Sequence, residues 1–88
     1  MPEICRFKGI RIFVSTSDHN TPYIHAKYGE YECSIDINEI ELIVGEMPNR
    51  QLKLIYGWMA EYQTDLLEEC YLALQSEQLF PIPPLYRG

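Results

Sequence analysis

The fold is decided by the stretch from Tyr23 to Asp36, which reads YIHAKYGEYECSID. Gly29 stands at the first central position of a possible two-residue type II′ hairpin turn. Such a turn sets the apolar residues of the two halves opposite each other on one face of the ribbon, in the pairs Tyr28–Tyr31, Ala26–Cys33 and Ile24–Ile35. The other face then carries the pairs Lys27–Glu32, His25–Ser34 and Tyr23–Asp36. Because the apolar sets coincide and the Lys meets a Glu, the sequence predicts an antiparallel hairpin in this register.

Two further segments around the hairpin are predicted to be strands. Residues 9–15 alternate, with Ile10, Ile12 and Val14 on one side. Residues 40–44 follow a short connection in which a two-residue turn would set Asp36 opposite Glu41, and this like-charge pair favours a longer or bulged loop. Turn-forming residues from Thr16 to Pro22 predict a loop between the first two strands.

The second half of the chain has helical periodicity over residues 49–76. The apolar residues on this spacing are Leu52, Ile55, Met59, Tyr62, Leu66, Cys70 and Leu74. A straight helix of this length would be about 42 Å long, whereas a compact domain of this size is roughly 30 Å across. We therefore expect a break near residues 63–65, where Asp65 and Glu68 resemble a capping box. The alternative is a protruding helix that packs against a second copy in a homodimer.

The change of period from two to 3.6 predicts an α+β fold. We expect an antiparallel sheet of three to four strands, with a C-terminal helix or kinked helix pair packed on one face. The 88 residues form one domain, expected over residues 1–77, and residues 78–88 are an extended Pro-rich tail. Phe80, Ile82 and Leu85 are expected to cover the edge of the protein's own core, and docking of this tail on a partner is the alternative.

Charge and cysteine usage narrow the classes of function. The formal net charge is −6, and the seven Lys and Arg are spread along the chain, so a basic patch and direct nucleic-acid binding are not expected. Three cysteines without a C-x-x-C spacing indicate reduced core residues. Neither an apolar run long enough to span a membrane nor a signal peptide is found, so the expected location is the cytoplasm.

The run Asp18-His19-Asn20-x-Pro22-x-x-His25-x-x-Tyr28-Gly29-Glu30, together with Trp58, carries a family resemblance. It is similar to a family of small bacterial domains of unknown function, whose signature reads D-H-x-P-P-H-x-H-x-x-Y-G-E. Thr21 stands where that signature has its first Pro, and Tyr23 where it has the first His of P-H-x-H. The resemblance implies a stand-alone cytoplasmic protein that is often encoded beside a second small protein, in pairs similar to toxin–antitoxin modules.

The first function hypothesis is a protein-interaction component that is not an enzyme and needs no cofactor. Its candidate binding residues lie on the sheet face that the helix leaves uncovered, namely Arg11, Phe13, Tyr23, His25 and Lys27. Arg, Tyr and Phe are residue types typical of interfaces and their hot spots. The expected partner is another small protein encoded nearby, and the alternative interpretation is a merely solvated face.

The second hypothesis is a small metal-assisted hydrolase or ribonuclease. A divalent metal would be held by the residues Asp18, His19, His25 and Glu30. The simpler interpretation is that Asp18 and His19 fasten the loop by hydrogen bonds. Covalent catalysis is not expected, because Cys33 faces the core side of the predicted hairpin.

Overall fold

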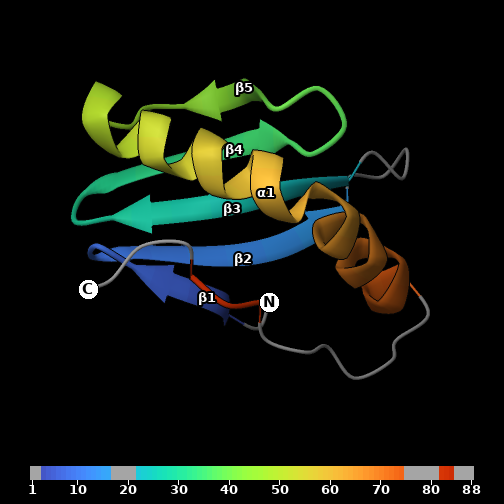
Figure 1. The fold of residues 1–88 in the computed structure, drawn as a ribbon. Helices are drawn as coiled ribbons and strands as arrows, with labels where there is room; N and C mark the ends of the chain where they lie inside the picture. The colour runs from blue at the N-terminus through green and yellow to red at the C-terminus, as the bar shows by residue number, and fades with distance from the viewer. Residues whose placement is uncertain (1–2, 17–21, 75–81, 85–88) are drawn as a thin grey trace.

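A computed structural model describes residues 3–16, 22–74 and 82–84 of the chain. The elements in these residues are β1 (Glu3–Phe7), β2 (Ile10–Thr16), β3 (Pro22–Tyr28), β4 (Tyr31–Asp36), β5 (Glu41–Gly45) and α1 (Asn49–Leu74). The strands form one antiparallel sheet in the order β1-β2-β3-β4-β5, and α1 crosses one of its faces (Figure 1). The predicted α+β fold is confirmed, with five strands in the described residues where three to four were expected.

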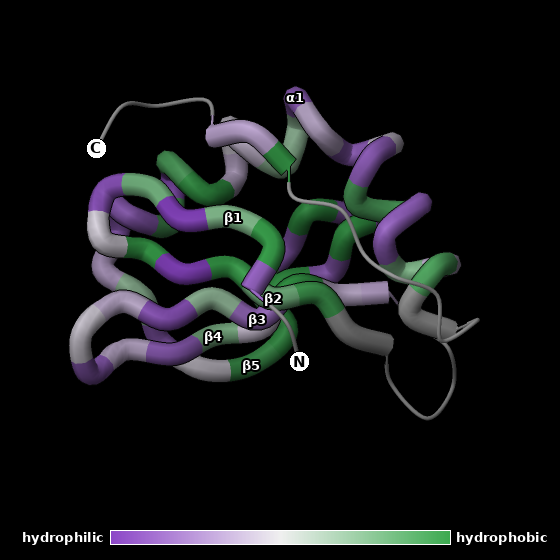
Figure 2. Tube along the Cα trace, turned by 90° about the horizontal axis from the view of Figure 1, so that it is seen from below, coloured by the Kyte–Doolittle hydropathy of each residue, from purple (hydrophilic) through white to green (hydrophobic). Residues whose placement is uncertain are grey.

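The hairpin of β3 and β4 has the predicted register at every pair from Tyr23–Asp36 to Tyr28–Tyr31. Gly29 has a φ of 57°, whereas Glu30 is not among the residues with positive φ, which is the pattern of a type II′ turn. The tube of β2 and β3 alternates between apolar and polar residues (Figure 2). This alternation gives each strand one face toward the core and one face away from it.

The alternation pattern does not predict β1. A bulge between Glu3 and Cys5 breaks the period, so that Ile4 and Cys5 are both buried although they are neighbours in sequence. The strand turns back into β2 through Lys8 and Gly9, whose φ values of 51° and 79° are those of a type I′ hairpin. An irregular strand of five residues gives too few alternating positions to be recognised.

The connection between β4 and β5 corrects one prediction. The loop of residues 37–40 is longer than two residues, as expected, but it does not separate the two acids, because Asp36 still pairs with Glu41. The Asp36 carboxylate accepts hydrogen bonds from the backbone N–H groups of Asn38 at 2.7 Å and Glu39 at 3.2 Å. These bonds direct the Asp36 carboxylate toward the loop, which explains why its pairing with Glu41 is tolerated. A bulge does occur, but it lies farther along β5 at Ile43.

The connection between β2 and β3 is shorter than the predicted loop. Thr16 and Pro22 were expected in the loop, but they end β2 and begin β3 and pair with each other. Pro is compatible with the first position of a strand. The remaining loop residues, 17–21, lie outside the described residues.

The helix α1 is kinked, as its length predicts. Twenty-six residues would make a straight helix of about 39 Å, and the longest dimension of the described structure is 33 Å. The break lies at Tyr62 (φ −112°, ψ 24°), one residue before the predicted segment. Next to it, the Gln63 side chain donates hydrogen bonds to the carbonyls of Ile37 at 2.8 Å and Asn38 at 3.0 Å. The kink therefore coincides with a tie between α1 and the β4–β5 loop.

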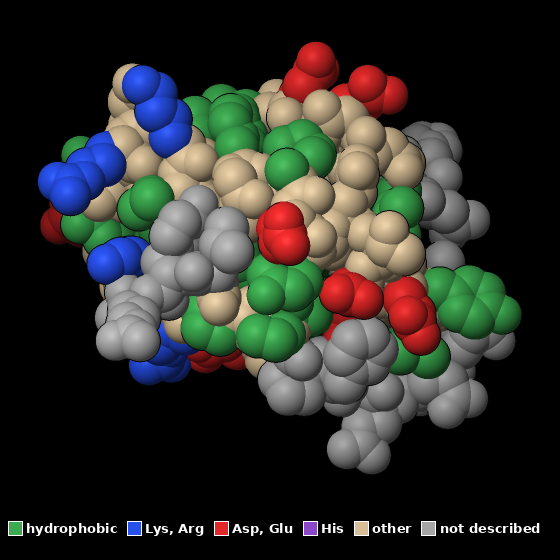
Figure 3. Space-filling model, viewed as in Figure 1, with side chains coloured by type: hydrophobic (Ala, Val, Ile, Leu, Met, Phe, Trp, Pro, Cys, Tyr) green, Lys and Arg blue, Asp and Glu red, His purple; other side chains and the backbone are tan. Residues whose placement is uncertain are grey.

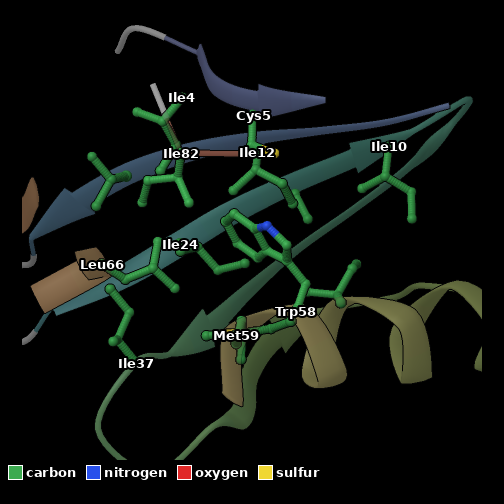
Figure 4. Packing of buried hydrophobic residues seen from close by; sticks show 14 of the residues in the cluster. Ile4, Cys5, Ile10, Ile12, Ile24, Ile37, Trp58, Met59, Leu66 and Ile82 are labelled. Atoms are coloured by element: carbon green, nitrogen blue, oxygen red, sulfur yellow. The ribbon is translucent and has the colours of Figure 1, made fainter. Parts of the chain in front are cut away.

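One hydrophobic core lies between α1 and the sheet (Figure 4). Trp58 and Met59 point from α1 toward Ile12 and Ile24 of the sheet, and all four are fully buried. The Trp58 ring also lies 5.5 Å from Phe7 and 6.1 Å from Tyr62, measured between centroids. Large aromatic contacts of this kind supply much of the apolar burial in a small domain.

The outer edge of β1 is covered by the chain's own C-terminal segment. Ile82 is 3% exposed, and its N–H donates to the Ile4 carbonyl at 2.9 Å. The Trp58 indole donates to the Pro83 carbonyl at 3.1 Å, which fixes the same segment over the core. Figure 1 shows residues 82–84 beside β1. Ile82 thus covers the core as expected, whereas Phe80 and Leu85 lie outside the described residues.

Candidate interaction surfaces

The sheet face opposite α1 carries the predicted binding residues. Arg11 pairs with Lys27 and Phe13 with His25 across β2 and β3, and Tyr23 continues the same face of β3. We call Arg11, Phe13, Tyr23, His25 and Lys27 the cationic strip. The two neighbouring strands therefore bring all five predicted residues together.

Phe13 is buried within this strip by its neighbours. It is 9% exposed, although it does not belong to the core cluster. The Arg11 guanidinium lies 5.3 Å and the Lys27 ammonium 5.6 Å from its ring centroid, and the His25 ring is 6.4 Å away. Cation–π contacts of this kind stabilise the strip by about 0.5–1 kcal/mol each. The Phe13 ring is thus a support for the charged side chains and is not presented as an apolar anchor.

The charges of the strip are largely paired within the molecule. Arg6 and Arg11 lie directly opposite each other on β1 and β2, and Glu3 bonds to both, at 2.7 Å and 3.3 Å. The hydrogen bond from Arg6 is the main reason why the pKa of the Glu3 carboxyl is lowered, and the same bond raises the pKa of Arg6. Lys27 lies 3.6 Å from Glu32. The positive charges of the strip are therefore mostly neutralised by acidic side chains of the same molecule.

Two side chains that could act as nucleophiles, Ser34 and Cys33, come from β4, next to the strand that carries His25. Ser34 Oγ and His25 Nδ1 are 3.5 Å apart, and in the described residues neither side chain has a further hydrogen bond that could complete a triad. Burial raises the pKa of the Cys33 thiol to about 11. The thiol is therefore protonated at neutral pH, as expected for a core cysteine.

The metal-binding residues of the second hypothesis are only partly described. Asp18 and His19 lie outside the described residues. His25 is in the middle of β3, whereas Glu30 is in the turn after β3, so the fold does not bring these two together. Across residues 3–16, 22–74 and 82–84 no three His, Cys, Asp or Glu side chains are grouped to hold a metal ion.

A second surface, at the opposite edge of the sheet from β1, was not among the predicted sites. Leu42, Ile43 and Val44 of β5 are 41%, 52% and 63% exposed, and we call these three residues the β5 edge. Among the strands, the backbone of α1 approaches β2 and β3 closely but not β5. Figure 2 shows β5 as the outermost strand, with apolar residues along it. Three consecutive apolar residues cannot all face the core from an alternating strand, and this was the available sequence signal.

Acidic residues surround the β5 edge. Glu41 begins β5, Glu39 precedes it and Glu46 follows it, and all three are exposed. Within the described part of the chain none of them forms an ion pair with Lys or Arg. The edge is therefore apolar in its middle and negative at both ends.

Comparison with known proteins identifies the family of the chain. No curated protein matches the chain. No solved structure matches it either. The domain of unknown function DUF4160 matches residues 9–69, more than two thirds of the chain. The match includes β2 to β5 and most of α1, whereas β1 and residues 82–84, which pack on each other, lie outside it. The chain belongs to the DUF4160 family.

Proposed function

We propose that the protein is a small interaction component that acts by binding a second small protein, as one half of a two-gene module of the toxin–antitoxin kind. The observation that carries this proposal is the exposure of Leu42, Ile43 and Val44 on an outermost strand. The outer side of such a strand presents backbone N–H and C=O groups that can pair with another chain. An exposed apolar strand of this kind is a typical site for strand addition by a partner.

The two edges of the sheet differ in a way that supports this proposal. The β1 edge is covered by residues 82–84, through the bond from Ile82 to Ile4. The β5 edge has no such cover among the described residues. It has a bulge at Ile43 and acidic residues at its ends, but neither Lys nor Pro, which commonly protect free edges. Because the protein covers its β1 edge with its own chain, binding of a partner best explains why the β5 edge is left exposed.

The hydrolase hypothesis receives less support from the described residues. The Ser34–His25 pair has no third member, and the Cys33 thiol is protonated at neutral pH. His25 lies in the middle of β3, whereas Glu30 lies in the turn that follows this strand. No helix in the described residues is long and apolar enough to cross a membrane.

Co-expression with the product of the neighbouring gene tests the proposal. Size-exclusion chromatography with light scattering should show a stable complex whose mass exceeds 10.3 kDa by the mass of the partner or a multiple of it. The unrelated product of a distant gene, expressed in the same way, is the control. A protein that elutes at its own mass in the presence of its neighbour would contradict the interaction function.

A further inference from the structure

We propose that the β5 edge binds an extended apolar segment that carries a basic residue at each end, and that this segment extends the sheet as a sixth strand beside β5. This inference rests on the proposed interaction function and specifies its surface and the chemistry of the partner. It follows from the arrangement of charge around β5, which selects among the possible occupants of the edge.

The geometry of β5 sets the length of the segment. Glu41 begins β5 and Glu46 follows it, and because Ile43 is an extra bulge residue the two lie beside Asp36 and Glu32 of β4, four strand steps or about 13 Å apart along the sheet. The apolar residues Leu42, Ile43 and Val44 lie between them. A partner strand with basic residues four positions apart and apolar residues between them would place one cation near each Glu. Opposite charges across strands stabilise the pairing, and like charges directly opposite destabilise it.

A second copy of the chain fits the same edge poorly. In an antiparallel pairing centred on Ile43, Glu41 would face Gly45 of the second copy, one residue from its Glu46. A shift by one residue would set Glu41 directly opposite Glu46. A parallel, in-register pairing would set Glu41 against Glu41. Each arrangement brings unpaired carboxylates together at both ends, so the acidic residues disfavour self-pairing while they favour a basic partner.

The acidic groups near β5 are free to act in this way. Asp36 and Glu32 on the neighbouring strand are engaged with the loop N–H groups and with Lys27, respectively. Glu41 and Glu46 form no ion pair with the described Lys and Arg side chains. The six described bases lie on β1, β2, β3, the β1–β2 turn and the start of α1, and none lies on β5 or in the β4–β5 loop.

Two synthetic five-residue peptides test the inference directly. Both have Val, Thr and Val in the three central positions, and one has Lys at both ends whereas the other has Glu. Each is titrated into the isotope-labelled protein at low salt, and backbone amide shifts are followed by NMR. We expect shifts centred on residues 41–46 with the Lys-ended peptide, and affinity at least about tenfold weaker with the Glu-ended peptide.

A charge-swapped variant makes the test specific. The double substitution Glu41→Lys and Glu46→Lys should reverse the preference, so that the Glu-ended peptide binds more tightly. The matched control is Glu61→Lys with Glu68→Lys, two exposed positions on α1, which changes the net charge equally and should leave the preference unchanged. Equal binding of both peptides, shifts outside β5 or no shifts at millimolar peptide would overturn the inference. So would a preference that follows net charge in the control.

The same variants separate this inference from the interaction function. If the neighbouring gene product binds the wild type and the α1 control but not the β5 swap, the inference gains support in the full complex. If the β5 swap still binds, the interaction function stands and the β5 assignment is wrong. A self-associating wild type whose dimer is lost in the β5 swap would assign the edge to a second copy and overturn the basic-partner inference.

Discussion

Gly45, at the end of β5, is a position where the local backbone does not tolerate a side chain. Its φ is 97°, and a Cβ at this position would lie 2.7 Å from the Cα of Cys33. Gly45→Ala therefore adds a steric clash to backbone strain, and we expect it to lower the free energy of unfolding by about 3 kcal/mol. Urea denaturation followed by Trp58 fluorescence measures this change.

Gly29 in the β3–β4 turn is the matched control. Its φ is 57°, but a Cβ there would meet nothing within 4 Å. Gly29→Ala should therefore cost only the backbone term, about 1–2 kcal/mol. Equal losses of stability in the two variants would show that the steric clash with Cys33 adds nothing to the cost of substituting Gly45.

Cys33 makes stability depend on alkaline pH. Burial raises the pKa of its thiol from 9.0 to about 11 in the folded protein. Between these values the unfolded chain releases the proton and the folded chain keeps it, so the free energy of unfolding should fall as pH rises from 9 to 11. Urea midpoints at pH 8, 9, 10 and 11 measure the slope, and Cys33→Ala should show a shallower one. An unchanged slope in that variant would assign the effect to other groups.

At the level of elements, the C-terminal segment is expected to stabilise β1. Ile82 is buried and bonded to Ile4, so Ile82→Ala should lower the free energy of unfolding by about 2–4 kcal/mol. Amide exchange at β1 should increase more than at β3 and β4. Pro84→Ala, at an exposed position of the same segment, is the control and should change stability by less than about 0.5 kcal/mol. Uniform acceleration across the sheet would mean that the segment does not protect this edge locally.

The elements differ in how far the sequence could predict them. The register of β3 and β4 was predictable because turn chemistry, apolar alternation and one charge pair agree on it. The helix kink was predictable from length, but its position at Tyr62 coincides with the Gln63 bonds to a loop distant in sequence.

The cationic strip was predictable as a face, whereas the burial of Phe13 depends on side chains from two strands. The openness of β5 depends on the path of α1, which local pattern does not determine.

At the level of the whole molecule, the antiparallel topology separates charges that are mixed along the sequence. The β1–β2 and β3–β4 turns and the start of α1 all lie at one end of the sheet. All six described bases lie at or near this end: Arg6, Lys8, Arg11, Lys27, Arg50 and Lys53. The Lys and Arg side chains visible in Figure 3 lie on the left of the view, and most acidic side chains lie in the centre and to the right. The linear order of charge, which predicts no basic patch, does not reveal this polarity.

The acidic residues around β5 should also keep copies of this protein apart. The net charge is −6, and Glu41 and Glu46 would meet their counterparts in any β5 pairing between two copies. Removing their charge with Glu41→Gln and Glu46→Gln leaves the apolar edge intact while it removes the repulsion. We therefore expect this double variant to self-associate at concentrations at which the wild type does not, as measured by sedimentation velocity across a concentration series.

The control for this prediction is the pair Glu61→Gln and Glu68→Gln on α1, which makes the net charge less negative by the same amount. If both double variants self-associate alike, the total charge of the molecule governs its solubility. If only the β5 variant does so, the repulsion is local to the edge. Added salt should have a smaller effect on the β5 variant than on the wild type, because screening acts on charges that the variant lacks. An unaltered sedimentation profile of the β5 variant would show that the charges of Glu41 and Glu46 are not what keeps the β5 edges of two copies apart.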